Sequence, residues 1–182
     1  MERLKSGIIT FSDYPEFRPN LTPREIFKLG SFGGTYWRPI YSSITGKHYK
    51  NKHKIYPKVW WDGIADDKMT QSIYDKHVNK YGVKTGSTLE EWEENNWIVD
   101  SHPYGWVQWY CDFYAGHRHA DDTRQIERWK KIAGPRGRFR RMLINKINQN
   151  KTTYDDFTIS PAIRQTLQHW GYKINKQDII KY

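Results

Sequence analysis

The sequence predicts a mainly α-helical fold, a compact helical domain with an aromatic core and a small β-hairpin in its N-terminal half. Aromatic residues make up 16% of the chain, which is enough to build a core although only 37% of the residues are hydrophobic. Aromatic side chains recur at helical spacing over residues 106–114. Capping patterns and glycines mark several helix boundaries. We expect an extended N-terminal arm over residues 1–20 and a single mainly helical domain over residues 21–182.

The first elements follow from local signals. A short strand is expected over Gly7–Phe11, within the arm. Thr22, Pro23 and Glu25 form a capping box with proline at the first helical position, and Gly30 ends that helix. Residues 35–49 contain β-favouring pairs on either side of a Thr-Gly-Lys turn, which predicts the hairpin.

Helical signals resume after residue 60. Met69, Ile73 and Tyr74 predict a helix that ends at Gly82. A second capping box over residues 87–90 begins the next helix. The strongest periodicity follows, with aromatic residues at positions i, i+3, i+4, i+7 and i+8. These residues, which we expect to carry the core, are Trp106, Trp109, Tyr110, Phe113 and Tyr114.

The C-terminal half predicts three further helices. The first two cover residues 121–133 and 135–148 and are separated by Gly134. The third begins at Ser160-Pro161 and ends at Gly171. A short terminal helix is expected within residues 172–182.

Composition excludes several classes of protein. A single cysteine, Cys111, excludes a disulfide framework and fits a reducing compartment. No apolar run has the length of a signal peptide core or of a membrane span. We therefore expect an intracellular protein, in the cytoplasm or nucleus, with no membrane partner.

Positive charge is concentrated in the second half of the chain. The formal net charge is +8 over residues 101–182 and +2 over residues 1–100. Such an imbalance attracts polyanions, although a solvated surface is the simpler alternative. The densest stretch, residues 124–141, has eight cations and one acid. The residues predicted to bind nucleic acid are Arg124, Arg128, Lys131, Arg136, Arg138, Arg140 and Arg141.

The basic helix pair over residues 121–148 is similar to a helix-turn-helix layout. In that layout the second helix enters the major groove with its first residues. The sequence therefore favours DNA over RNA as the partner. An ordinary helical hairpin with a solvated basic face is the alternative.

A second basic segment, Lys47–Lys58, lies among aromatic residues that could stack on unpaired bases. Packing in the core is the competing interpretation, and it is favoured for the Trp residues. The aromatic residues concerned are Tyr36, Trp37, Tyr41, Tyr49 and Tyr56.

His117, His119, Asp121 and Asp122 contain metal-ligating groups. Their spacing matches no metal signature, and the two Asp residues suit a helix N-terminus. The sequence therefore predicts neither a metal site nor a cofactor.

No nucleotide-binding or nucleophile motif is present, and Cys111 is expected to be packed rather than reactive. Two alternatives to nucleic-acid binding stay open. One is a metal-dependent nucleic-acid enzyme that uses His119, Asp121 and Asp122. The other is a structural or assembly protein that binds an acidic partner through the basic face.

The stretch from Tyr104 to Trp129 resembles a widespread family of uncharacterised proteins, whose core motif reads roughly GWxxWYxxFYxGRRxxDDxRQIxRW. Residues 33–36, Ser160-Pro161, Arg164-Gln165 and His169-Trp170 extend the resemblance over most of residues 20–170. This chain has His117 where the family has Arg. The resemblance implies no particular activity.

Overall fold

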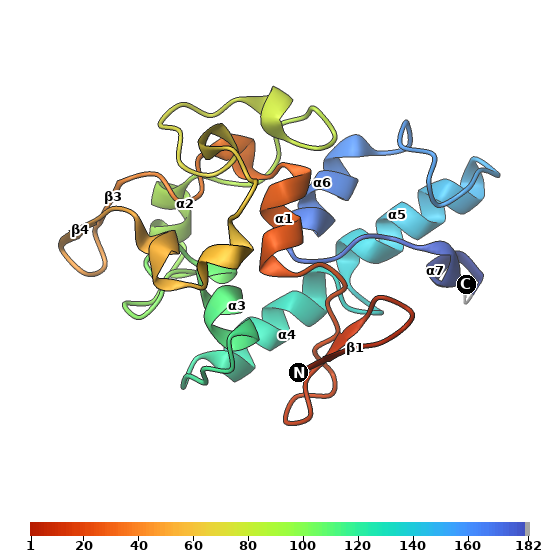
Figure 1. Cartoon of the computed structure of the whole chain (residues 1–182). Coiled ribbons are helices and arrows are strands. Elements are labelled where there is room, and N and C mark those ends of the chain that lie inside the picture. The colour runs from red at the N-terminus through yellow and green to blue at the C-terminus, as the bar shows by residue number, and fades with distance from the viewer. Residues whose placement is uncertain (181–182) are drawn as a thin grey trace.

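Helix α3 (Trp106–Tyr114) is buried on almost every side, and the rest of the chain is arranged around it (Figure 1). In this computed structural model residues 1–180 are described. Helical residues, counting the short 3-10 turns together with the α-helices, account for 42% of the described chain, and two small antiparallel hairpins provide the strands. The other helices are α1 (Pro23–Leu29), α2 (Leu89–Glu94), α4 (Asp122–Ile132), α5 (Arg138–Gln149), α6 (Pro161–His169) and α7 (Lys176–Ile180).

The two hairpins lie in the N-terminal third. Strands β1 (Glu2–Arg3) and β2 (Ile9–Thr10) pair first. Strands β3 (Ile40–Ser42) and β4 (Lys47–Tyr49) then form the predicted hairpin. Short 3-10 turns and irregular chain connect β4 to α2.

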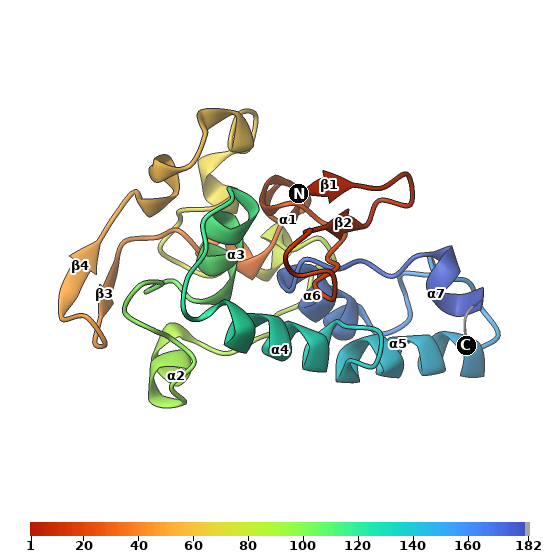
Figure 2. The same ribbon diagram turned by 90° about the horizontal axis from the view of Figure 1, so that it is seen from below.

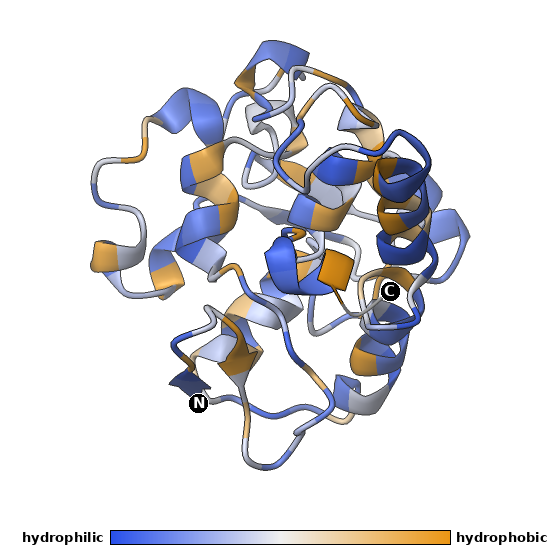
Figure 3. Ribbon diagram, turned by 90° about the vertical axis from the view of Figure 1, so that its right-hand side faces the viewer, coloured by the Kyte–Doolittle hydropathy of each residue, from blue (hydrophilic) through white to orange (hydrophobic). Residues whose placement is uncertain are grey.

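The core is a continuous aromatic network. Trp109, Tyr110 and Phe113 of α3 are fully buried, as the periodicity predicts, and Trp106 is nearly so. Phe17 contacts several rings at 5.1–5.7 Å between centroids, among them Trp109 and Trp129 of α4. Several helices in Figure 3 carry both hydrophobic and hydrophilic residues, as expected of amphipathic helices that cover a core.

Residues 1–20 are not the extended arm expected from the sequence. They fold back as the β1–β2 hairpin and bury Ile9, Phe11 and Phe17. Asn20 fixes the end of this segment by accepting from the Lys173 backbone N–H and donating to the Lys173 carbonyl, both at 2.7 Å. The short strand predicted here is present, but it is only two residues long.

Three other expectations need correction. The helix predicted from Met69, Ile73 and Tyr74 is absent from the described chain, and the Ile73 side chain is 79% exposed. Three apolar residues leave most of the predicted helix face polar, so too little apolar surface is available to hold such a helix against the core. The second capping box joins Thr88 to Glu91, one residue later than predicted. Helix α5 begins at Arg138, so Pro135 belongs to the preceding turn. The terminal helix α7 is present, and residues 181–182 lie outside the described chain.

Candidate functional site

Helices α4 and α5 carry most of the predicted cations and are joined by a tight turn. A Cβ at Gly134 would lie 2.6 Å from the carbonyl oxygen of Lys130, and one at Gly137 would lie 2.6 Å from that of Ile132. Only glycine fits at either position. In both Figure 1 and Figure 2, α5 continues in the direction of α4 along one edge of the molecule. The helices therefore do not cross as the helices of a helix-turn-helix do.

Three of the seven predicted residues are partly buried and also have partners within the protein. Arg124 pairs with Asp121 at 2.5 Å. The Arg128 guanidinium lies over the rings of Trp97 and Trp170, at 5.5 and 5.4 Å from their centroids. Arg140 donates to Asp178 and is largely buried, so it ties α5 to α7 rather than offering a contact to solvent.

The other four predicted residues are exposed and form no ion pair with any described residue. Lys131 lies in the last turn of α4, Arg136 lies in the turn between the helices, and Arg138 and Arg141 lie one turn apart on α5. No side chain caps the N-terminus of α5. Its first backbone N–H groups and these four cations create a positive potential at one place, where an anion would be favoured. We call Lys131, Arg136, Arg138 and Arg141 the basic surface.

A cavity of about 470 Å³ adjoins the basic surface. Lys131 of the basic surface lines it, and so does Phe139, which follows Arg138 in the sequence. Its volume is in the range of ligand-binding pockets. Aromatic rings from separate parts of the chain form most of its wall. These are Phe32, Tyr36, Trp92, Trp97, Trp106, Phe139 and Trp170. We call it the aromatic cavity.

Arg128 brings a positive charge to this cavity. It donates to the Trp97 carbonyl at 3.3 Å and to Gln125 at 3.1 Å, which holds its guanidinium between two indole rings. Burial, and then the charge of neighbouring Arg124, lower the pKa of Arg128 to about 10. The side chain therefore stays charged at neutral pH.

His169 adds a directional polar group to the cavity wall. Its Nε2 accepts from the Phe32 backbone N–H at 3.0 Å and faces the side-chain amide of Gln165 at 3.1 Å. Burial lowers the pKa of His169 to about 3, so the ring is neutral at pH 7. Because Nε2 is an acceptor, the proton resides on Nδ1, which forms no hydrogen bond within the described residues.

A smaller cavity of about 230 Å³ continues from the aromatic cavity and shares six of its lining residues, including Phe32 and Trp92. Arg38 and Lys84 line its other part, together with the carboxylate of Glu90. Cations therefore line both ends of the combined groove, with aromatic rings between them.

The loop Lys47–Lys58 fits stacking less well. Tyr36, Trp37 and Tyr56 are buried in the core, whereas Tyr41 is exposed and Tyr49 is partly so. Cys111 is fully buried, and burial raises the pKa of its thiol well above the usual value. It is a packed side chain, as expected.

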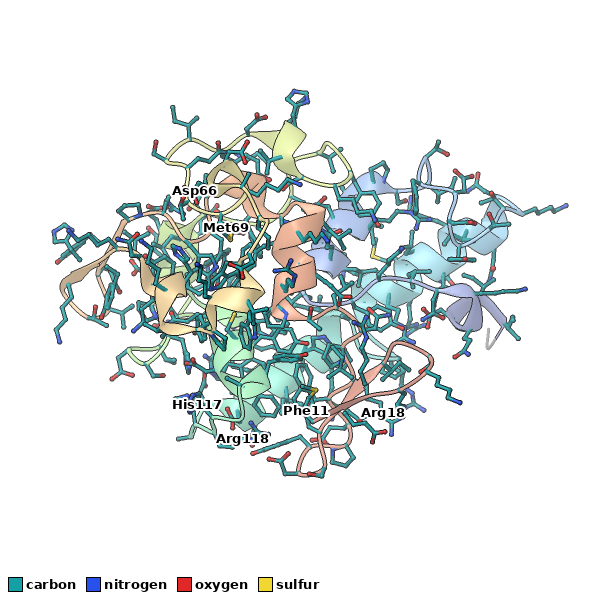
Figure 4. The ribbon with its side chains drawn as sticks, in the orientation of Figure 1. Phe11, Arg18, Asp66, Met69, His117 and Arg118 are labelled. Atoms are coloured by element: carbon teal, nitrogen blue, oxygen red, sulfur yellow. The ribbon has the colours of Figure 1, made fainter. Side chains whose placement is uncertain are left out.

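His117, His119, Asp121 and Asp122, which the sequence does not predict to form a metal site, do not come together in the structure. Asp122 accepts from the Trp109 indole N–H at 2.7 Å and from the His119 backbone N–H at 3.0 Å. Asp121 holds Arg124 and Gln125. His117 is exposed beside Arg118, which lies near Phe11 at the lower edge of the molecule (Figure 4). Asp121 and Asp122, the two carboxylates of the alternative enzyme hypothesis, thus both accept hydrogen bonds from neighbouring residues.

His119 instead meets two residues that the sequence did not single out. Its Nε2 lies 3.7 Å from Oδ2 of Asp112, and the same oxygen lies 3.1 Å from Nε2 of His102. The three ligating atoms lie within 4.8 Å of one another. Burial alone would raise the pKa of Asp112, but hydrogen bonds from His102 and Tyr56 and the two nearby imidazoles outweigh it and lower the pKa.

Comparison with protein families, curated proteins and solved structures found no match for this chain. Among the described residues, no helix combines the length and apolarity needed to cross a bilayer. The site must therefore be interpreted from its own chemistry.

Sequence patterns found the basic surface because its residues are close in the chain. They missed the aromatic cavity, whose Trp residues come from α2, α3, the segment between them and the end of α6. The only sequence signal was the high Trp content, which does not distinguish core from cavity. The stacking of His169 on Phe32, at 3.9 Å between ring centroids, likewise depends on tertiary packing.

Proposed function

We propose that the protein binds nucleic acid, with DNA favoured, and that it holds an unpaired segment of the strand. The observation that carries the proposal is the aromatic cavity beside four cations that have no ion-pair partner among the described residues. Proteins that bind single strands combine a positively charged track for the backbone with aromatic rings for the bases. The composition, with one buried cysteine, favours an intracellular location.

Each part of the groove has a distinct role in this proposal. The basic surface and the N-terminus of α5 receive phosphates, and Arg128 and Lys131 hold the phosphate next to the cavity. Trp97, which is partly exposed at the cavity, stacks on a base. Arg38 and Lys84 receive the strand at the far end of the groove. The near-collinear α4 and α5 suit this track better than insertion of one recognition helix into a major groove.

Fluorescence anisotropy with labelled DNA tests the proposal. Single-stranded and duplex forms of one oligonucleotide are titrated with the full chain at two salt concentrations. We expect tighter binding of the single strand and quenching of Trp fluorescence. Each phosphate contact on a single strand contributes about 0.7 to the dependence of log affinity on log salt.

Matched triple variants locate the surface. Arg136→Gln, Arg138→Gln and Arg141→Gln together should lower the salt slope by about 2. Lys50→Gln, Lys54→Gln and Lys58→Gln remove the same charge from another exposed loop and should leave the slope nearly unchanged. Absence of binding at low salt would refute nucleic-acid binding. An equal loss in both triple variants would show a diffuse charge effect and refute this surface.

A further inference from the structure

We propose that His102, Asp112 and His119 bind a divalent transition metal ion of the Zn²⁺ class. This inference does not depend on nucleic-acid binding. The ligands come from one short stretch of chain, with His102 just before α3, Asp112 on it and His119 just after it. Asp112 and Tyr114 are the two residues of α3 that are not buried. The Asp112 carboxylate therefore lies at the edge of the core, close to the imidazoles of His102 and His119.

The distances from Oδ2 of Asp112 to the two imidazole nitrogens are close to those expected between ligands of one ion. In a tetrahedral site with ligand distances near 2.0–2.1 Å, neighbouring ligand atoms lie roughly 3.3 Å apart. The observed separations from Oδ2 of Asp112 are 3.1 Å to His102 and 3.7 Å to His119. All three atoms lie within 4.8 Å of one another, so side-chain rotations that bring them closer together would let them bind one ion.

His119 supplies the observation that a structural role leaves unexplained. Its Nε2 is buried and has no hydrogen-bond partner among the described residues, since 3.7 Å to Asp112 is too long for one. An unsatisfied buried polar atom is costly, so it usually has a partner. A metal ion on Nε2 supplies that partner.

His102 could be explained without a metal. Its Nε2 pairs with Asp112, and its Nδ1 contacts the Ser101 hydroxyl at 3.0 Å. The same contacts suit a metal ligand. When Nε2 binds the ion, Nδ1 carries the proton and donates to Ser101, as metal-bound imidazoles donate their second N–H to a neighbour.

The core holds the ligands in place. The Trp109 indole donates to Asp122, and Asp122 accepts the backbone N–H of His119. Asp122, which resembles a metal ligand in sequence, is thus a positioning residue for one. Such indirect supports are part of the design of metal sites.

The donor set identifies the class of ion. Two imidazoles and one carboxylate suit Zn²⁺ and its neighbours, whereas Mg²⁺ and Ca²⁺ prefer oxygen ligands. Three protein ligands leave a fourth position of a tetrahedral ion open. The His119 side chain is 32% exposed and that of Asp112 15%, whereas His102 is fully buried, so the open position is on the His119 side.

The test uses the full chain, freed of metal with a chelator that is then removed. Co²⁺ is titrated first, because its visible absorption reports coordination, and Zn²⁺ binding is measured by calorimetry. We expect one ion per chain and displacement of Co²⁺ by Zn²⁺. Circular dichroism confirms that each variant is folded.

His119→Ala and His117→Ala form a matched pair, since both histidines lie in the loop after α3 and only His119 is in the cluster. We expect His119→Ala to weaken Zn²⁺ affinity by on the order of 100-fold and His117→Ala to leave it unchanged. The wild-type chain failing to bind one ion would overturn the proposal. Equal affinity in the His119→Ala chain would also overturn it, because the ion would then lie elsewhere.

Discussion

Arg140 donates to Asp178 at 2.5 Å, which joins the start of α5 to α7 across 38 positions of the sequence. The guanidinium also lies 4.3 Å from the centroid of Tyr172, whose hydroxyl donates to the same carboxylate. Charge density alone placed Arg140 among the residues predicted to bind nucleic acid. Its environment makes it a structural residue.

Replacing Arg140 should therefore change stability. Arg140→Gln leaves the buried Asp178 without its cation and should cost about 3 kcal/mol of unfolding free energy. Arg141→Gln, one residue later and exposed, should change it by no more than about 0.5 kcal/mol. Urea denaturation of both variants measures the difference. Equal stability of the two variants would contradict a structural role for Arg140.

Arg141 should instead affect binding. On the proposed single-strand surface, Arg141→Gln removes one phosphate contact and should lower the salt slope of DNA affinity by about 0.7. Anisotropy titrations at several salt concentrations measure the slope. A slope identical to that of the wild type would remove Arg141 from the surface.

Trp109 is the test of the core. Its side chain is fully buried and its indole N–H holds Asp122. Trp109→Ala should cost about 3–5 kcal/mol, the range for deleting a large buried aromatic ring. Ile73→Ala, at a residue that is 79% exposed, is the control and should be within about 0.5 kcal/mol of wild type. Similar denaturation midpoints for the two variants would show that the aromatic stripe is not central.

His169 should make the fold sensitive to acid. Burial lowers its pKa to about 3, whereas an unfolded histidine has a pKa of about 6.5. Between these values the unfolded chain binds more protons, so the stabilisation is complete above pH 6.5 and is lost as the pH falls toward 3. Each pH unit contributes at most about 1.4 kcal/mol.

The variant His169→Gln isolates this contribution. Its side-chain oxygen can accept from Phe32 in place of Nε2, but it does not titrate. Denaturation at several pH values should give a flatter dependence for the variant than for the wild type. Identical profiles would mean that His169 titrates normally in the folded protein.

Local patterns predicted α1, α3 and the β3–β4 hairpin because each depends on neighbouring residues, such as the Thr22–Glu25 capping box. Position 135 was misjudged because proline suits both a first helical turn and a tight turn. Here Gly134 and Gly137 pack closely against the backbone of α4, which places Pro135 in the turn between the helices.

The candidate sites were predicted less completely, for a different reason. Seven arginines and lysines could be identified by charge, but which of them have partners depends on distant residues such as Asp178 and Trp97. The cluster of His102 with His119 needs the length of α3 between them, and no short spacing marks it. The sequence identified the cationic residues, and the tertiary contacts show which of them are paired within the protein.

The paired hydrogen bonds between Asn20 and Lys173 have a consequence for the order of folding. The β1–β2 hairpin is synthesised before the helices, but the backbone that secures its end is made 153 residues later. Contacts of such high sequence separation require a large loop to close, which slows folding. During synthesis Phe11 and Phe17 must wait for α3 and α4, so the nascent chain exposes these two aromatic side chains until both helices have been made.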